Sequence, residues 1–212
     1  MNVKNKHIID NIIWSIEDDE KNIFDRIYFK NLWYSKESIS GKGSEMDSVK
    51  NILTKLPKLF SNLDIVTILD APCGDYSWMN KMNYHFKNYI GIDIVEDLSN
   101  ENNKKYTNNN VNFKCLNIIS DNLPKADIIL CRDCFIHLSF DDILKTIQNF
   151  KNSNSKYLLT TTYKNLKNNI NIYNGGFRKI NLELPPFNFS KSEFEIQEQD
   201  DKFLSLWRLD CI

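Results

Sequence analysis

The hydrophobic positions of this chain change their periodicity along its length. Over residues 11–29 and again over 47–63, apolar side chains recur mostly every three or four residues, which predicts amphipathic helices. A polar, glycine-containing loop separates these segments, and Ser44 with Asp47 predicts the start of the second helix. From residue 64 onward, short β-branched runs alternate with helical patterns, which is typical of an α/β domain.

The second part of the chain predicts a doubly wound, mostly parallel sheet of the Rossmann-like type. Apolar runs predict strands at 66–70, 89–93, 111–116, 127–131 and 156–162, and the patterns between them predict helices at 76–84, 98–106 and 141–151. The last runs, 194–199 and 203–210, flank a turn and predict an antiparallel hairpin, which completes a seven-stranded sheet. We therefore predict one domain over 1–212, with N-terminal helices and a loop in 1–63 and the core in 64–212.

Length and charge narrow the function. The 212 residues fit a single domain. The 27 basic and 28 acidic residues give a formal net charge of −1, which disfavours nucleic acid or an anionic membrane as a partner. The absence of a long apolar run or an apolar signal core predicts a cytoplasmic protein. The five cysteines are odd in number and lie mostly in apolar runs, which predicts reduced thiols.

The strongest chemical signal is the end of the first predicted strand, where Asp70 is followed by a tight turn with Gly74. Ligands bind at this edge of doubly wound sheets. A glycine there lets a ligand approach the main chain, and a carboxylate favours a cationic amino group. The next strand ends in Asp93, which is placed to accept hydrogen bonds from ribose hydroxyls.

These strand ends resemble the motifs of the class I S-adenosylmethionine (SAM)-dependent methyltransferases, over residues 65–210. Pro72 and Tyr76 stand in two glycine places of the first motif, which favours SAM over NAD because SAM has no pyrophosphate to bind. The resemblance implies SAM as the cofactor and S-adenosylhomocysteine (SAH) as the product. It implies that the residues holding SAM are Asp70, Ala71, Gly74, Asp93, Ile94, Asn117 and Ile118.

The end of the fourth predicted strand carries the candidates for catalysis. Methyl transfer to a hydroxyl requires alignment and removal of a proton, and His137 suits that role near neutral pH. Asp133 either orients His137 or is the base itself, and Arg132 holds an anionic substrate group or the carboxylate of SAM. The alternative is an ion pair between Arg132 and Asp133, with His137 packing a turn. Cys131, Cys134 and His137 also have metal-ligand spacing, but without a second clear pair we predict no metal.

Two loops complete the predicted site. Residues 38–44 contain two glycines and three serines, and we expect Ser40 and Gly41 to cover the methionine end of SAM. Trp33 adds an aromatic wall beside the sulfonium. The aromatic and basic segment 173–189 predicts a substrate cover. The residues expected to contact the acceptor are Tyr163, Arg178 and Asn181.

The sequence thus predicts an O-methyltransferase for a small polar acceptor. The motifs Ser-x-Ser-Gly-x-Gly-Ser at 38–44, Asp-Ala-Pro-Cys-Gly-Asp at 70–75 and Leu-Pro-Pro-Phe at 184–187 resemble a bacterial subgroup with relatives that act on sugars or surface-polysaccharide precursors. This resemblance implies a sugar, a nucleotide sugar or a phosphorylated metabolite as the acceptor. Two alternatives are an NAD-dependent oxidoreductase with Asp93 on the ribose, and a non-catalytic module that regulates a partner enzyme.

Overall fold

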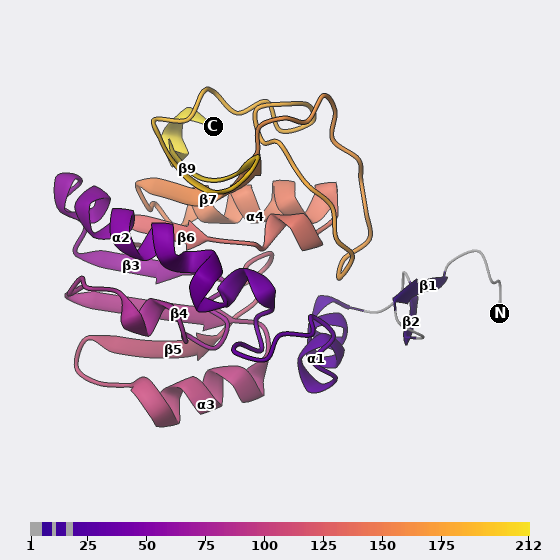
Figure 1. Cartoon of the computed structure of the whole chain (residues 1–212), viewed down its shortest axis with the longest axis horizontal. Helices are drawn as coiled ribbons and strands as arrows, with labels where there is room; N and C mark the ends of the chain where they lie inside the picture. The colour runs from indigo at the N-terminus through magenta and orange to yellow at the C-terminus, as the bar shows by residue number, and fades with distance from the viewer. Residues whose placement is uncertain (1–5, 10–11, 16–18) are drawn as a thin grey trace.

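A sheet of seven strands forms the centre of the protein, in the order β5-β4-β3-β6-β7-β9-β8 (Figure 1). The structure, a computed structural model, describes residues 6–9, 12–15 and 19–212. The strands of the sheet are β3 (Thr67–Asp70), β4 (Asn88–Asp93), β5 (Val111–Cys115), β6 (Ile128–Cys131), β7 (Tyr157–Tyr163), β8 (Phe194–Gln199) and β9 (Lys202–Arg208). From β5 to β7 all neighbours are parallel, whereas β9 is antiparallel to β7 and β8. The predicted doubly wound sheet with a C-terminal antiparallel hairpin is confirmed.

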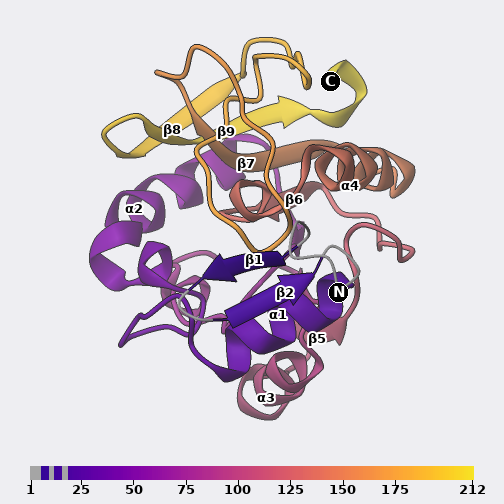
Figure 2. The ribbon, with the colours of Figure 1, turned by 90° about the vertical axis from the view of Figure 1, so that its right-hand side faces the viewer.

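Helices cover both faces of this sheet. They are α2 (Met46–Asn62), α3 (Glu96–Tyr106) and α4 (Phe140–Asn152), whereas α1 (Glu20–Phe29) lies beyond the ends of the strands (Figure 1). Figure 2 shows α2 on one side of the sheet and α4 on the other. Of the helices that the structure describes, none is both long and apolar enough to cross a membrane.

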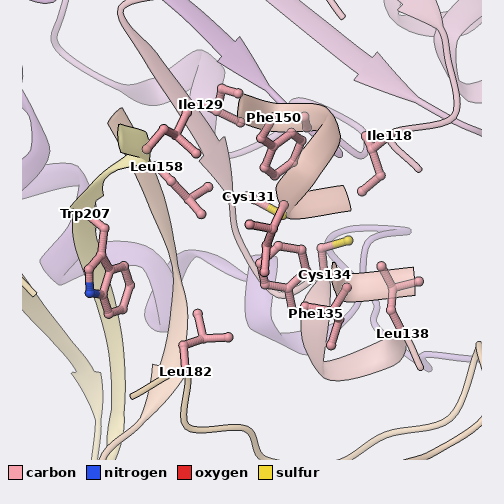
Figure 3. Packing of buried hydrophobic residues seen from close by; sticks show 14 of the residues in the cluster. Ile118, Ile129, Cys131, Cys134, Phe135, Leu138, Phe150, Leu158, Leu182 and Trp207 are labelled. Carbon is pink, nitrogen blue, oxygen red and sulfur yellow. The ribbon is translucent and has the colours of Figure 1, made fainter. Parts of the chain in front are cut away.

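Neighbouring residues of each strand pack into different halves of the core, because successive side chains of a strand point to opposite faces. Ile68 packs in the cluster that contains the buried face of α2, and Leu69 in the cluster that contains the buried face of α4. In the second cluster, Ile129 and Leu158 of the sheet lie near Phe150 of α4 (Figure 3). The sheet is therefore buried on both sides, as parallel sheets usually are.

The register of the strands brings the predicted chemical groups to one edge. Asp70 is paired with Gly91 of β4 and with Leu130 of β6. The carboxyl ends of these three parallel strands therefore coincide, with Asp70, Asp93 and the residues after Cys131 beside one another. Figure 2 looks onto this edge, in front of which α1 lies.

The N-terminal part departs from the prediction of helices over 11–29. Among the described residues of that range, helix is confined to α1, while β1 (Lys6–Ile9) and β2 (Ile12–Ser15) form a separate antiparallel pair. Ile12 and Ile13 are β-branched, a residue type that favours strands. Residues 10–11 and 16–18, which the same prediction covered, lie outside the described residues. Further along, α2 begins after Glu45 rather than Ser44, and no side chain caps its first turn.

The helix predicted at 76–84 is also absent from the structure. A turn takes its place, followed by a single 3₁₀ turn at Met79–Lys81. Tyr76 has a φ of 58°, a left-handed conformation that a right-handed helix cannot include. The carboxylate of Asp75 accepts a hydrogen bond from the backbone of Ser77 (3.1 Å), which offers the chain a turn in place of a helix.

Candidate functional site

A cavity of about 390 Å³ opens at the carboxyl ends of β3, β4 and β6. Its walls also come from α1, the loop 38–44, the segment after β6 and the hairpin of β8 and β9. The sequence-predicted site residues that line it are Trp33, Ser40, Gly41, Asp70, Gly74, Asp93, Ile94, Asn117, Ile118, Arg132, Asp133, His137 and Tyr163. The fold thus gathers into one cavity residues that lie far apart in the chain, from Trp33 to Tyr163.

Asp70 is a buried carboxyl group without a cationic partner in direct contact among the described residues. It is 3% exposed, and the hydroxyl of Tyr89 donates a hydrogen bond to its Oδ2. Burial raises the pKa of Asp70 to about 7, although the Tyr89 hydrogen bond and the charge of Arg132 act in the opposite direction. A ligand cation placed in the cavity beside Asp70 would favour its ionised form. The next residue, Ala71, is fully buried and does not line the cavity.

Asp93 joins the cavity wall to the turn after β3. Its Oδ2 accepts a hydrogen bond from the backbone of Gly74 (3.2 Å), and its Oδ1 accepts one from Val95 (3.0 Å). Burial raises the pKa of Asp93 to about 6, even though these backbone hydrogen bonds lower it. A carboxylate has room for further donors beside these two. Ribose hydroxyls are the donors that this position suits.

The far wall of the cavity is apolar. Ile94 and Ile118 lie there as predicted, together with Leu116 and with Phe24 of α1. Asn117 also lines the cavity, but its Oδ1 accepts a hydrogen bond from the backbone of Ile119 (2.9 Å). Its amide oxygen therefore already stabilises the local turn. An apolar lining of this kind suits the ring of a purine.

The loop 38–44 packs directly on the turn after β3. Ser40 Oγ accepts a hydrogen bond from the backbone of Asp75 (3.1 Å), and the backbone of Ile39 donates to the Asp75 carboxylate (3.2 Å). Gly74 has a φ of 55°, and a Cβ added there would lie 2.1 Å from Ser40 Oγ. Only glycine at position 74 permits this close contact. The loop consequently forms one wall of the cavity.

A buried cluster of four charged side chains lies at the other end of the cavity. Arg132 donates to both carboxylate oxygens of Glu198, from Nε at 3.1 Å and from Nη2 at 2.7 Å. Lys202 Nζ lies 2.7 Å from Asp133 Oδ2 and 2.9 Å from Glu198 Oε2. Arg132 Nη1 lies 3.4 Å from Asp133 Oδ2, so the alternative ion pair between these two residues is present. The cluster contains two positive and two negative groups and is neutral as a whole.

The ion pairs of this cluster limit the roles of Arg132 as a ligand for anions and of Asp133 as a base. The guanidinium of Arg132 already holds Glu198 and the carbonyl of Gly43 (2.7 Å), so it is a poor ligand for a further anion. Burial alone would raise the pKa of Asp133, but the charges of Arg132 and Lys202 outweigh it and bring the pKa to about 2. Asp133 is therefore a very weak base at neutral pH.

His137 has the geometry of a neutral base. Its Nδ1 lies 2.7 Å from the carbonyl oxygen of Gly176. Since a carbonyl only accepts, Nδ1 carries the proton and Nε2 keeps its lone pair. Burial lowers the pKa of His137, against the effects of the Gly176 hydrogen bond and the Asp133 charge. The ring stacks on Trp33 with 5.1 Å between centroids, which fixes its orientation.

Two of the residues expected to contact the acceptor lie away from the cavity lining. Arg178 is buried and donates from its guanidinium to the carbonyl oxygens of Phe135 and Leu138. The side-chain oxygen of Asn181 accepts a hydrogen bond from the backbone of Glu183 (3.0 Å). Both side chains thus hold the loop after β7 in place, because its backbone carbonyl and amide groups need partners there. Tyr163 alone of the three lines the cavity.

The comparisons with known proteins agree with this architecture. No protein-family model matches the sequence, and no curated protein matches it. Among solved structures, magnesium protoporphyrin IX methyltransferase from Synechocystis PCC 6803 with bound SAM superposes with a TM-score of 0.61 at 13% identity, over 92% of this chain and 99% of that one. This is the Rossmann-like methyltransferase fold.

Other structures with the methyltransferase fold are equally similar. Human N-acetylserotonin methyltransferase in complex with SAM has a TM-score of 0.61 at 10% identity, over 92% of this chain but 61% of its own. This chain therefore spans less than two thirds of that protein. The cyanobacterial enzyme with bound SAH has a TM-score of 0.59 at 14% identity, over 89% of this chain and 97% of that one. Such identities establish the fold, and the function has to be argued from the site.

Several residues at the site were not predicted from the sequence. Glu198 and Lys202 come from β8 and β9, and their spacing carries no motif. Phe24 belongs to a helix whose pattern predicted only burial.

The residues that the structure describes contain no cluster of three or more histidine, cysteine, aspartate or glutamate side chains able to hold a metal ion. The alternative metal site at Cys131, Cys134 and His137 is therefore not supported.

Proposed function

We propose that the protein transfers the methyl group of SAM to a hydroxyl group of a small molecule, with His137 as the base. One observation carries this proposal. A neutral imidazole with an unprotonated Nε2 lines the same cavity as Asp70 and Asp93, the two strand-end carboxyls that suit an amino acid and a ribose. A methyl donor and a proton acceptor are the two elements that methylation of a hydroxyl requires.

The residues present fit SAM. Asp70 would take its amino group, Asp93 its ribose hydroxyls, Ile94 the face of its adenine and Ile118 the edge of that ring. Asp70 in particular is a buried carboxyl whose raised pKa reflects the need for a positive charge beside it. When bound, SAM supplies a methyl group on a sulfonium, which is electrophilic without further activation. The protein then has to exclude water, hold the acceptor and remove its proton.

His137 is better suited than Asp133 to accept that proton. A general base works best when its pKa lies near the working pH. Asp133, with a pKa of about 2 and an ion pair to Lys202, falls far below that range. His137 is neutral at pH 7, and its tautomer is set by the carbonyl of Gly176. As the acceptor oxygen takes the methyl group, its proton passes to Nε2 of His137.

The proposal concerns methyl transfer to oxygen, and the choice of a sugar acceptor rests on sequence resemblance alone. Of the two arginines considered for an anionic acceptor, Arg132 is paired with Glu198, and Arg178 donates to backbone carbonyls. The case for a phosphorylated acceptor is therefore weak.

Binding of SAH to purified protein tests the proposed donor site. We expect saturable micromolar binding in a calorimeter, and we expect Asp93→Ala to weaken it roughly 10- to 100-fold, because loss of hydrogen bonds to a charged group costs about 1.5–3 kcal/mol. Asp97→Ala, which removes an exposed carboxylate outside the cavity lining, is the matched control and should bind SAH normally. Binding of NAD instead of SAH would favour the oxidoreductase, and binding of neither would leave the proposed donor site without support.

Replacing His137 tests whether the protein is an enzyme or a non-catalytic module. His137→Asn is expected to lower the rate of methyl transfer roughly 10²- to 10⁴-fold, the usual contribution of a general base, while SAH binds as before. Since burial lowers the pKa of His137 below its ordinary 6.5, the acid limb of the rate profile should lie below pH 6.5. His85→Asn changes an exposed histidine as the control. An unchanged rate in His137→Asn would remove His137 as the base.

A further inference from the structure

Phe177 is exposed although the backbone on both sides of it is firmly bonded. The residue is 63% exposed and lines the cavity. Before it, the backbone of Gly175 donates to the carbonyl of His137 (2.9 Å), and after it, the backbone of Arg178 donates to the carbonyl of Ile136 (3.1 Å). The segment that carries Phe177 is therefore attached to the turn that carries the proposed base.

Arg178 strengthens this attachment. Its buried guanidinium donates to the carbonyls of Phe135 and Leu138, at the two ends of the same turn. Phe177 cannot bury its ring by a shift of the loop without breaking these bonds. A large apolar side chain that a rigid backbone holds exposed at a cavity is typical of a ligand contact, because the ligand supplies the burial that the empty protein lacks.

The ring of Phe177 also lies beside the proposed base. Its centroid is 5.9 Å from that of His137, whose other aromatic neighbour is Trp33 at 5.1 Å. Nδ1 of His137 is taken by Gly176, so a reacting hydroxyl has to reach Nε2. Any molecule that does so brings the atoms next to its hydroxyl close to these aromatic rings.

The charged side chains at this end are, in contrast, already paired with one another. Lys202 forms ion pairs with Asp133 and Glu198, and the side chains of Asp133 and Lys202 are only 20% and 11% exposed. A sugar acceptor needs several hydrogen-bond partners, and these charged groups are already engaged. The exposed ring of Phe177 is a surface here that a ligand can cover.

We infer that the acceptor is a phenol, a flat aromatic ring that stacks on Phe177 and carries the reacting hydroxyl. This inference rests on the proposed function and names the substrate class of the same site. A phenolic hydroxyl has a pKa of about 10, as in tyrosine, so a neutral imidazole removes its proton far more readily than that of an aliphatic hydroxyl. The phenolic oxygen forms a bond to the methyl carbon, and the bond from that carbon to sulfur breaks. The electron pair stays on sulfur, which gives SAH, and the proton goes to Nε2 of His137 and then to water.

The experiment compares a phenol with a sugar on the protein saturated with SAH. The probes are 7-hydroxycoumarin, 4-methylcatechol and methyl β-D-glucoside, titrated in a calorimeter, and each is also incubated with SAM carrying a labelled methyl group. We expect at least one phenol to bind and to be methylated, and the glucoside to do neither. Phe177→Ala should weaken phenol binding roughly tenfold and leave the affinity for SAH within about twofold. Phe177→Tyr, which keeps the aromatic ring, should bind the phenol with nearly the affinity of the unchanged protein.

Ile170→Ala is the matched control, since Ile170 is an apolar residue of the same loop, 67% exposed, outside the cavity lining. It should bind the phenol like the unchanged protein. The inference is overturned if neither phenol binds to the SAH complex, if phenol binding is the same in Phe177→Ala, or if the glucoside is the molecule that binds and is methylated. Failure of SAH itself to bind is a different result, which overturns the proposed function.

Discussion

Replacing Glu198 with glutamine is expected to lower the free energy of unfolding by about 3–5 kcal/mol, the usual cost of breaking a buried ion pair from one side. The side chain of Glu198 is 1% exposed and is the counter-ion of both Arg132 and Lys202. A neutral amide leaves the two cations with Asp133 alone, so the buried cluster carries one uncompensated positive charge. Urea denaturation measures the loss, followed by tryptophan fluorescence, to which the buried Trp78 and Trp207 contribute.

The same strand provides the control for this experiment. Glu195 lies three positions earlier on β8 and forms an ion pair with Lys164 at 2.7 Å, but its side chain is 33% exposed. Exposed pairs contribute about 0–1 kcal/mol, so Glu195→Gln should cost far less than Glu198→Gln. Equal losses for the two variants would mean that the buried cluster contributes no more than a surface pair. The rate of methyl transfer should also fall in Glu198→Gln, because the cluster forms the wall beside His137.

The place of Asp70 in the site could be predicted from the sequence, whereas that of Glu198 could not. Asp70 and Asp93 each end a buried run of apolar residues, and such a run with an acid at its end marks the carboxyl end of a strand. Because neighbouring parallel strands end at the same edge of a sheet, these two strand ends must lie close together. The position of these side chains in one cavity therefore follows from local sequence and a general rule of topology.

Glu198 carries no such signal. Along the chain it looks like Glu195, because both are acids in a short strand at the edge of the sheet. It lies on the same buried face of β8 as Ile196, two positions earlier. What makes it a counter-ion is Arg132 of a distant part of the chain, 66 positions earlier. No local pattern in the sequence indicates that this pair meets.

Local backbone geometry explains the other differences. The apolar pattern at 76–84 fits a helix, but the left-handed conformation of Tyr76 and the turn at Asp75 prevent one. Arg178 lies in a loop that contains basic and aromatic residues, and this composition predicts contact with a ligand. In the structure its donors satisfy backbone carbonyls of a neighbouring turn instead, and Phe177 beside it, not predicted from the sequence, is the residue that lines the cavity.

Asp70 is expected to lower the free energy of unfolding of the empty protein and to strengthen the binding of SAH. Its pKa is about 7 in the folded protein, against about 3.9 in an unfolded chain. Between these values the folded state holds a proton that the unfolded state has lost, so this group's contribution to stability falls as the pH rises from about 4 to 7. A shift of about 3 pH units corresponds to about 4 kcal/mol above pH 7. Asp70→Asn, which cannot ionise and can still accept the Tyr89 hydrogen bond, should therefore raise the free energy of unfolding at pH 8.

The same substitution should weaken SAH binding about 100-fold, because the amino group of SAH loses a charged partner in a buried site. The affinity of the unchanged protein for SAH should rise between about pH 6 and 8 as Asp70 ionises, and Asp70→Asn should lose this part of the rise. Asp93, with a pKa of about 6, is present in both proteins, so the difference between them reports the loss of the Asp70 carboxylate together with its effect on Asp93. Tyr89→Phe removes the hydrogen bond that lowers the pKa of Asp70, so the rise should move to higher pH. Normal SAH binding by Asp70→Asn would show that Asp70 is not the partner of the amino group, and a loss of stability at pH 8 would contradict the raised pKa of Asp70.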